Sequence, residues 1–337
     1  MTTISIAMAT YNGERFIREQ LASLKSQTVL PSELIVTDDG STDRTLDLIS
    51  EFAATAPFPV RVWKNDEKFG YKANFMKCAS LCSGDLIAFA DQDDVWLPGK
   101  LEAQRKIFED PAVLLSSHDV MLLSEDGSEL GDRWQMLPRA GSYTFDQMRP
   151  SALSLGFTQM FRKELLQFSD HWRNPSVDAK TLMAHDEYYF LIACVIGCVF
   201  YESNVYAHYR QHSSNVTGRK KKESMIKALS NRINLGREEY ERYVRYSLER
   251  VRVLSSLQAD PKVTEQQRKK IDTAAQSYAR FSSLHALRSK LYGGQHVGDR
   301  AAALLELCQS GGYRLRPNPW HLTLGGFAKD FLAVFYR

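Results

Sequence analysis

The stretch Asp85-Leu-Ile-Ala-Phe-Ala-Asp-Gln-Asp-Asp94 decides how the rest of the chain is interpreted. Its apolar first half is typical of a buried β-strand, and three aspartates follow directly after that strand. Outward from it, the first 118 residues alternate between short β-branched runs and helical patterns. This alternation predicts an α/β fold in which a mostly parallel sheet carries helices on both faces. The expected strands are 4–9, 33–37, 60–63, 85–90 and 113–117, and the expected helices are 14–27, 42–54, 72–80 and 99–109.

Polar loops follow three of these strands. In open α/β sheets the reactive residues collect beyond the carboxyl ends of the strands, so these loops are where a functional site is expected. The loops are Ala9-Thr-Tyr-Asn-Gly13, Thr37-Asp-Asp-Gly-Ser-Thr-Asp43 and Ala90-Asp-Gln-Asp-Asp94.

The three aspartates of the last loop are the strongest signal. Asp91, Asp93 and Asp94 would repel one another unless a cation or hydrogen-bond donors offset their charges. Hard oxygen ligands favour Mg²⁺ or Mn²⁺, so the loop predicts a divalent metal site. The structural alternative is a solvated acidic turn that caps the helix expected from about Pro98.

The second loop contains more carboxylates than a turn requires. Ser41, Thr42 and Asp43 are explained by a tight turn and a helix cap. Of the two aspartates before them, Asp38 and Asp39, one could accept the ring N–H of a pyrimidine base. In the first loop, the Tyr11 ring could cover a nucleobase or ribose, although a simple turn is the default interpretation of that segment.

Further candidates lie outside these loops. Lys72, at the start of the third helix, could meet an anion, or could simply be solvated. His185-Asp186-Glu187 offers a carboxylate that could take a proton from a hydroxyl, or that only stabilises the first turn of a helix. Arg210 could pair with a phosphate, and His212 could complete a metal shell or remain an ordinary surface histidine.

Composition excludes several classes of protein. The 337 residues are 44% hydrophobic and 25% charged, as in a folded globular chain. The net charge of +3 hides a division: residues 1–218 carry −9 and residues 219–337 carry +12. The longest uncharged apolar run is too short to span a bilayer, and the first residues lack the features of a secretory signal. We therefore expect a cytoplasmic protein.

The later part of the chain is less regular. A hairpin is expected around Glu125-Asp-Gly-Ser128, followed by a mixed region. From Lys220 onward the pattern is helical, with an apolar face that includes Ile226, Leu229, Ile233, Tyr240, Tyr243, Val244, Leu248, Val251 and Leu254. Further helices are expected at 264–291 and 298–308.

Taken in order, these motifs resemble family 2 glycosyltransferases, which have the GT-A fold. The motifs that carry the resemblance are Ala9–Gly13, Gln27-Thr28, Pro31–Asp43, Gly70-Tyr-Lys-Ala-Asn74, Ala90-Asp-Gln-Asp-Asp-Val-Trp-Leu-Pro98 and His185-Asp-Glu187. The Asp-Gln-Asp-Asp-Val-Trp motif and the Tyr209-Arg-Gln-His212 segment are similar to bacterial rhamnosyltransferase-like enzymes of surface polysaccharide synthesis. The resemblance is dense to residue 118, thinner to about 216 and absent beyond.

The resemblance implies a division into domains. Residues 1–216 would form a GT-A domain, with a mixed, mostly parallel sheet, a nucleotide-binding half at 1–118 and an acceptor half at 119–216. Beyond the resemblance, the helical pattern and the excess of basic residues predict a basic helical region at residues 217–337. That region, with the aromatic residues near its end, could rest on the anionic inner face of the cell membrane, or could simply be a solvated basic surface.

The resemblance also implies an activity and roles for individual residues. The enzyme would transfer a sugar from a UDP- or dTDP-sugar to a saccharide or lipid-linked saccharide, with inversion, in O-antigen or capsule synthesis. Asp93 would hold Mg²⁺ or Mn²⁺ with His212, and Asp186 would be the catalytic base. Asp94 could share the metal, and Glu187 leaves the choice of base open. The implied substrate-binding residues are Thr10, Tyr11, Asp39, Lys72, Asn74, Asp91 and Arg210.

Two other functions fit parts of the sequence. A phosphatase of the haloacid dehalogenase type also places Asp-x-Asp after an apolar strand, but Val95 stands where that class usually has threonine, and its motif normally follows the first strand. A nucleic-acid-binding protein would suit the basic residues 219–337. Their charges are spread without an identifiable reading motif, and the acidic first part would oppose such binding.

Overall fold

A computed structural model of the chain describes residues 2–134, 139–152, 154–173, 182–213, 215, 236–313, 320 and 322–335. Internal contacts divide the chain into two compact units. The first comprises the described residues of Met1–Phe145 and Leu153–Gly218, and the second those of Asp146–Ala152 and Arg219–Arg337. Helical expectations for residues 220–235, including Ile226, Leu229 and Ile233, lie outside the described residues.

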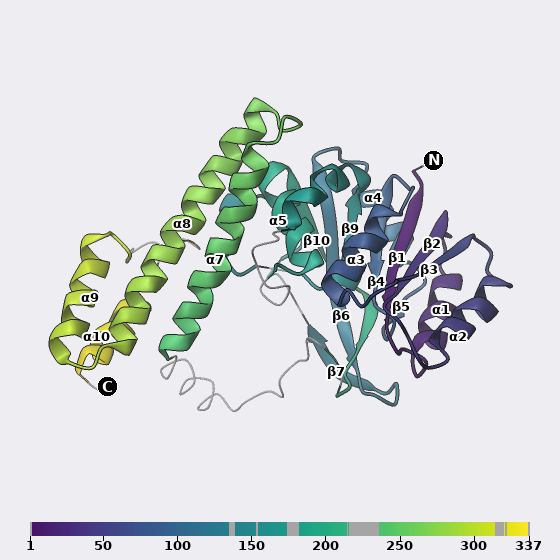
Figure 1. The fold of residues 1–337 in the computed structure, drawn as a ribbon, viewed down its shortest axis with the longest axis horizontal. Helices are drawn as coiled ribbons and strands as arrows, with labels where there is room; N and C mark the ends of the chain where they lie inside the picture. The colour runs from purple at the N-terminus through teal and green to yellow at the C-terminus, as the bar shows by residue number, and fades with distance from the viewer. Residues whose placement is uncertain are drawn as a thin grey trace. The chain divides into compact units, whose positions relative to one another are not determined.

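The first unit is built on one mixed sheet of ten described strands, in the order β3-β2-β1-β4-β9-β6-β10-β5 (Figure 1). β3, β2, β1 and β4 are parallel, as are β6 and β10, whereas β9 lies antiparallel between β4 and β6. β7 and β8 join the sheet through β6 and β10. The strands are β1 Ile4–Thr10, β2 Glu33–Asp38, β3 Val60–Lys64, β4 Leu86–Ala90, β5 Val95–Trp96, β6 Val113–Leu123, β7 Glu129–Trp134, β8 Gly141–Tyr143, β9 Met160–Arg162 and β10 Cys198–Arg210.

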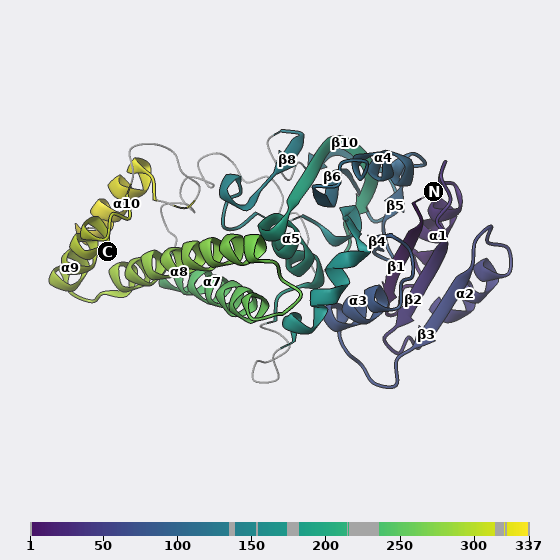
Figure 2. The ribbon, with the colours of Figure 1, turned by 90° about the horizontal axis from the view of Figure 1, so that it is seen from above.

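Helices flank both faces of this sheet, which confirms the expected α/β class. In Figures 1 and 2, α1 and α2 lie on one side of β1 to β3 and α3 lies on the other. Right-handed crossovers require this arrangement, because the strand order reverses after β3. The helices of this unit are α1 Ile17–Lys25, α2 Thr45–Ala53, α3 Tyr71–Ser80, α4 Lys100–Ile107 and α5 His185–Ile196, with 3₁₀ segments at Gly156–Thr158 and Lys163–Trp172. A further 3₁₀ segment, Phe145–Gln147, lies where the chain passes from the first unit to the second.

The predicted elements agree with the structure except at their ends. α1 begins three residues later than expected, because residues 14–16 form a turn in which Phe16 N–H donates to the Gly13 carbonyl at 3.1 Å. The expected strand 113–117 continues to Leu123, where it pairs with β7. The hairpin is confirmed, and its turn is closed by a 2.8 Å hydrogen bond from Ser124 N to Ser128 O.

The second unit is helical, as predicted. It contains α7 Arg237–Gln258, α8 Glu265–Gly293, α9 Val297–Gln309 and α10 Leu324–Phe335. α7 and α8 run side by side in both views (Figures 1 and 2). A capping box starts α8, with Thr264 and Gln267 each accepting from the other's backbone N–H.

One part of the predicted helical face is wrong. Leu248 is 53% exposed, while Ser247 and Arg250 take the buried positions on α7. These polar residues are tolerated because Ser247 Oγ donates to the Tyr243 carbonyl at 2.8 Å and the Arg250 guanidinium stacks 3.1 Å from the Tyr246 ring. The spacing of hydrophobic residues could not predict this, because it does not show which polar side chains find a hydrogen-bond or ring partner within the helix.

Asp330 is a buried carboxylate of the second unit. Its carboxylate has no solvent exposure and accepts hydrogen bonds from Arg288 Nε at 2.7 Å, Tyr292 Oη at 2.9 Å and Tyr313 Oη at 2.7 Å. These contacts join α8, the segment after α9 and α10 around one anion. A buried charge that is paired and hydrogen-bonded in this way is tolerated in a protein interior.

Candidate active site

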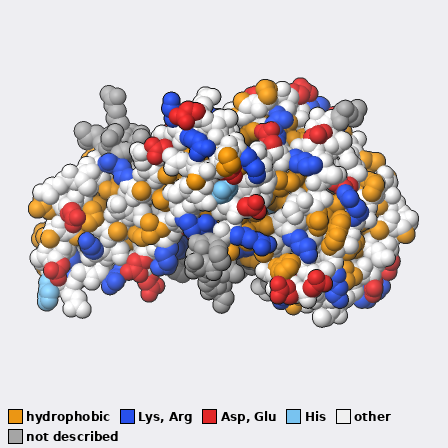
Figure 3. Space-filling view, turned by 45° about the horizontal axis from the view of Figure 1, so that its top comes forward, with side chains coloured by type: hydrophobic (Ala, Val, Ile, Leu, Met, Phe, Trp, Pro, Cys, Tyr) orange, Lys and Arg blue, Asp and Glu red, His pale blue; other side chains and the backbone are white. Residues whose placement is uncertain are grey.

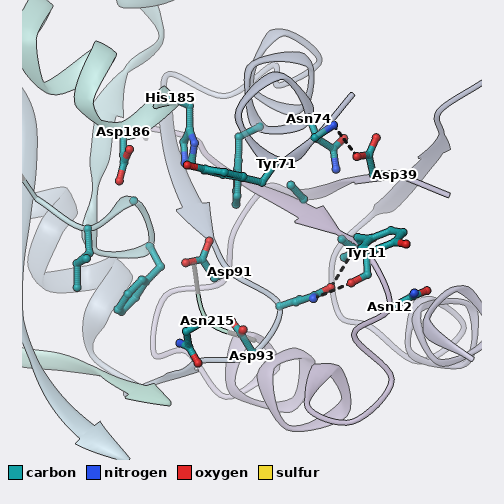
Figure 4. Close-up of a pocket in the computed structure, with 18 of the residues that line it drawn as sticks. Tyr11, Asn12, Asp39, Tyr71, Asn74, Asp91, Asp93, His185, Asp186 and Asn215 are labelled. Carbon is teal, nitrogen blue, oxygen red and sulfur yellow. Dashed lines mark hydrogen bonds between the residues drawn. The ribbon is translucent and has the colours of Figure 1, made fainter. Parts of the chain in front are cut away.

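The carboxyl ends of the central strands open onto a cavity of about 550 Å³ in the first unit. Its walls come from the loops after β1, β2 and β4, the segment around Gly156, the start of α5 and the residues after β10. Figure 4 shows the labelled side chains around this space, with Tyr11 and Asp39 toward one end and Asp186 toward the other. Segments far apart in the sequence therefore meet at the edge of the sheet where a site was expected.

Three carboxylates cluster where β4 ends. The ligand oxygens of Asp91, Asp93 and Asp94 lie within 4.8 Å of one another. Burial raises the pKa of Asp91 and of Asp94 well above the ordinary value, and the nearby charge of Asp93 adds to both shifts. Asp94 is 1% exposed, and its Oδ2 has no hydrogen-bond partner in the described part of the chain.

This loop is held from several sides. Gln20 Nε2 donates to the Asp91 carbonyl at 2.9 Å, and Arg210 Nε donates to the Asp93 carbonyl at 3.1 Å. The backbone N–H of Arg210 donates to Asp94 Oδ1 at 3.1 Å. His212 Nε2 lies 2.8 Å from Asp93 Oδ2, and both residues line the cavity. The carboxylates are thus fixed close together in spite of their repulsion.

The residues of the loop fit a divalent cation. Carboxylate oxygens are the ligands that Mg²⁺ and Mn²⁺ prefer, and three of them converge here. A cation would also satisfy Asp94 Oδ2, whose burial without a partner is costly. Asp91, Asp93 and Asp94 are the candidate ligands, with His212 beside Asp93.

Asp39 occupies the other end of the cavity. It is 3% exposed and accepts from Phe69 N at 2.7 Å, Gly70 N at 2.8 Å and Asn65 Nδ2 at 3.1 Å. A carboxylate offers about four lone-pair positions, so one remains for a further donor. Asn74 lines the same wall.

Neighbouring polar residues keep this wall in place. Asn74 Nδ2 donates to the Thr37 carbonyl at 3.0 Å, and Asn65 Nδ2 also donates to Asn74 Oδ1 at 2.9 Å. Thr10 Oγ1, on the cavity wall, donates to Asp38 Oδ2 at 2.8 Å. Asp38 in turn accepts from the backbone of the next turn, so its carboxylate shapes the loop rather than facing the cavity.

The structure places a different lysine at the cavity from the one suggested by the sequence. Lys72 is not among the lining residues, and its Nζ donates to the Leu182 carbonyl. Lys68 lines the cavity instead, with its Nζ 3.6 Å from the centroid of the Tyr11 ring. Gly70, just before α3, has a φ of +77°, a conformation that favours glycine and that the sequence analysis did not use.

Arg210 lies behind the cavity rather than in its wall. It is 2% exposed, is absent from the lining residues, and reaches Glu19 and the Glu125 carbonyl in addition to the acidic loop. Its guanidinium also lies 5.0 Å from the centroid of the Phe16 ring. In this arrangement Arg210 ties the acidic loop to α1 and to the β6–β7 turn.

Asp186 faces the cavity from the first turn of α5. Burial raises the pKa of its carboxyl to about 7, and the neighbouring charge of Glu187 contributes. Glu187 is not among the lining residues. The structure therefore brings Asp186, and not Glu187, to the same space as the acidic loop.

His185 was noted in the sequence only as the residue before Asp186. It is 4% exposed and lines the cavity, and neither ring nitrogen has a hydrogen-bond partner in the described residues. Its ring stacks on Phe75 with centroids 4.0 Å apart and meets the edge of Phe89 at 4.7 Å. Burial lowers the pKa of His185 to about 3, so the imidazole is neutral at physiological pH. Sequence alone could not reveal this, because the aromatic neighbours come from α3 and β4.

Comparisons with known proteins agree with this geometry. The model of the family "Glycosyl transferase family 2" matches residues 5–168. The chain is 31% identical over 218 residues to dTDP-rhamnosyl transferase RfbG of Shigella flexneri, covering 63% of this chain and 73% of that protein. It is 35% identical over 101 residues to the glucosyltransferase WfgD of Escherichia coli, covering 30% and 39%.

A solved structure supports the fold over most of the chain. TarS 1–349 of S. aureus, in complex with UDP, aligns with a TM-score of 0.56 and 16% identity, covering 93% of each chain. The expected GT-A fold is therefore confirmed. The acidic motif follows β4 and not the first strand, which argues against the phosphatase alternative. The family match favours neither a phosphatase nor a nucleic-acid-binding protein.

Proposed function

The chain belongs to glycosyl transferase family 2, and from this membership we propose that it transfers a sugar from a UDP- or dTDP-sugar to a saccharide hydroxyl with inversion. The observation that carries the proposal is the presence of the acidic loop and Asp186 on the walls of one cavity. A diphosphate leaving group and an attacking hydroxyl require these two kinds of group.

The acidic loop and Asp186 have separate tasks in this reaction. Asp93, with Asp91 and Asp94, would hold Mg²⁺ or Mn²⁺, which neutralises the negative charge that develops on a departing diphosphate. Asp186 accepts the proton of the acceptor hydroxyl as that oxygen attacks the anomeric carbon from the face opposite the diphosphate. A single displacement of this kind inverts the configuration. Asp186 suits the role because its pKa of about 7 makes it a stronger base than an exposed carboxylate.

Asp39 is proposed to select the base. Uracil and thymine carry a ring N–H that can donate to its remaining lone pair, whereas the corresponding nitrogen of cytosine only accepts. Tyr11, 42% exposed beside this carboxylate, would cover the base or ribose, and Thr10 and Asn74 would complete the wall. Lys68 is the cation that the structure adds to this end of the cavity.

We propose a carbohydrate acceptor of the cell surface. RfbG is named as a dTDP-rhamnosyl transferase, and the name of WfgD specifies transfer of glucose to a diphosphoundecaprenol-linked sugar. By analogy, this chain would act in O-antigen or capsule synthesis as a rhamnosyl- or hexosyltransferase. A lipid-linked acceptor would place the enzyme at the inner face of the cell membrane.

The second unit supports such a location. The described helices include none that is both long enough and apolar enough to cross a bilayer. α10 nevertheless exposes an apolar stripe, with Leu324 52%, Phe331 47%, Leu332 54% and Phe335 57% exposed. Residues 219–337 carry +12, although acidic and basic side chains are interspersed on the face drawn in Figure 3. An apolar stripe in a basic region suits peripheral contact with anionic lipid.

Flotation with vesicles tests this contact. We expect the protein to float with vesicles containing anionic lipid at low salt, and to float less at high salt because the charges are screened. A Phe331→Ser/Phe335→Ser variant should float less at both salt concentrations. If the unmodified protein does not float at low salt, the proposed contact with the membrane is wrong.

Calorimetry and product release test the activity itself. UDP or dTDP should bind in the presence of Mn²⁺ and much more weakly in EDTA, and a panel of nucleotide sugars should identify the donor by the nucleotide released. Hydrolysis of simple phosphate monoesters, without metal-dependent nucleotide binding, would instead favour a phosphatase.

A further inference from the structure

Gln92 stands between Asp91 and Asp93 but takes no part in the acidic cluster. Its side-chain amide pairs with the backbone of Tyr11 in both directions. Nε2 donates to Tyr11 O at 3.0 Å, and Oε1 accepts from Tyr11 N at 3.0 Å. The dashed lines beside Tyr11 in Figure 4 mark this pair. Two hydrogen bonds of opposite direction to one residue fix both its distance and its orientation.

Gly13 makes room for this pair. A Cβ at position 13 would lie 2.3 Å from Gln92 Oε1, a separation that real structures essentially never show. The φ of Gly13 is not positive, so a Cβ here would conflict with the Gln92 side chain and not with the backbone conformation. The glycine of the first loop and the glutamine of the acidic loop therefore depend on each other.

The residue after Tyr11 is fixed from the opposite side. Asn12 adopts a φ of +47°, and its N–H donates to Ser41 Oγ at 2.9 Å. Asn12 Oδ1 accepts from Thr42 N at 2.9 Å. The backbone around Tyr11 is thus clamped between the β2–α2 loop and Gln92. Tyr11 is 42% exposed, and its ring contacts Lys68, whose Nζ lies 3.6 Å from the ring centroid.

We propose that Gln92 is a positioning residue that holds Tyr11 as the platform for the nucleoside of the donor, a role that rests on the proposed function. The acidic loop then has two separate tasks. Its aspartates hold the metal, and the glutamine between them sets nucleoside affinity. Asparagine is one methylene too short to make both bonds, and glutamate or methionine cannot donate to Tyr11 O.

Phosphate-free nucleosides separate these two tasks, because they make no contact with the metal. We would titrate uridine and thymidine into the full-length protein, following chemical shifts by NMR, with Gln92→Met as the main variant. Losing both hydrogen bonds should weaken nucleoside binding by about tenfold. Mn²⁺ affinity should stay within about twofold of the unmodified protein. Donor KM should rise by about tenfold, with kcat at saturating donor unchanged.

A second variant, in the loop after β1, disturbs the same contact between Gln92 and Tyr11. Gly13→Ala should displace the Gln92 side chain and weaken nucleoside binding to a similar extent. Gly99→Ala is the matched control, because a Cβ there meets nothing within 4 Å. It should bind nucleosides like the unmodified protein.

The outcomes distinguish this proposal from the proposed function. If the unmodified protein binds neither nucleoside nor nucleotide, the glycosyltransferase assignment itself fails. If it binds them and Gln92→Met binds nucleoside equally well, only the role of Gln92 is wrong. A loss of Mn²⁺ affinity with unchanged nucleoside affinity would also overturn it, since Gln92 would then be a support of the metal loop.

Discussion

The acidic loop of the first unit and Asp330 of the second unit both bury carboxylates, but only one of them satisfies its charge. Asp330 receives three hydrogen bonds from Arg288, Tyr292 and Tyr313. In the acidic loop, Asp94 Oδ2 has no partner among the described residues. The contacts of Asp330 stabilise a helical unit. The acidic loop, in contrast, keeps a buried acceptor that a cation could satisfy. The difference shows that the partners of a buried charge, more than its burial, indicate its role.

The largest expected effect is on turnover. Asp186→Asn should lower kcat by about 10²- to 10⁴-fold, because the amide cannot accept the proton of the acceptor hydroxyl. Donor affinity should remain nearly unchanged, as measured by calorimetry with Mn²⁺. Asp93→Asn serves as the contrasting variant, since it should also weaken metal-dependent donor binding. Normal transfer to the natural acceptor by Asp186→Asn would contradict the assignment of the base.

Removing the Asp330 carboxylate should lower the stability of the second unit and not the rate of transfer. Asp330→Ala leaves Arg288 buried without its anion, which costs about 3–5 kcal/mol. We expect a marked fall in the denaturation midpoint followed by circular dichroism. Asp330→Asn, which keeps an acceptor oxygen, should lose less. Equal stability of the alanine variant and the unmodified protein would show that this cluster does not hold the second unit together.

The activity should depend on pH in the direction set by Asp186. A base must be deprotonated to act, and the pKa of Asp186 is about 7. Log kcat should therefore rise with pH at slope of about one below 7 and level off above it. A profile measured with saturating donor and metal that stays flat from pH 5 to 8 would indicate that another group accepts the proton.

The smallest expected effect is on the stability of the first unit. The pKa of Asp186 is raised on folding, so its contribution to stability is fully present below 3.8 and is lost as the pH rises through about 7. Asp186→Asn avoids this loss, because the amide never ionises. We expect its Tm to exceed that of the unmodified protein by roughly a few degrees at pH 8, and by less at pH 5. Equal differences at both pH values would contradict this sign.

The sequence predicted those features that depend on residues close together in the chain. The strands of the first 118 residues were predicted from short apolar runs, and their order brings the three polar loops to one edge of the sheet. The positions of Asp39, Asp91, Asp93 and Asp186 at strand ends and at a helix start made them candidates, and the family resemblance then implied their individual roles. The same approach selected Lys72, whereas the structure has Lys68 at the cavity, since nothing local shows which lysine side chain reaches it.

By itself, then, the sequence determined the α/β class, the acidic loop and the family, because periodicity and motif order survive in a linear chain. Only the tertiary structure decided which groups meet. It isolated His185 between the rings of Phe75 and Phe89, placed Arg210 behind the acidic loop, and paired Gln92 with Tyr11, 81 residues away. Such contacts depend on how strands and loops lie across the sheet, and distances of a few ångströms between remote segments leave no trace in local sequence.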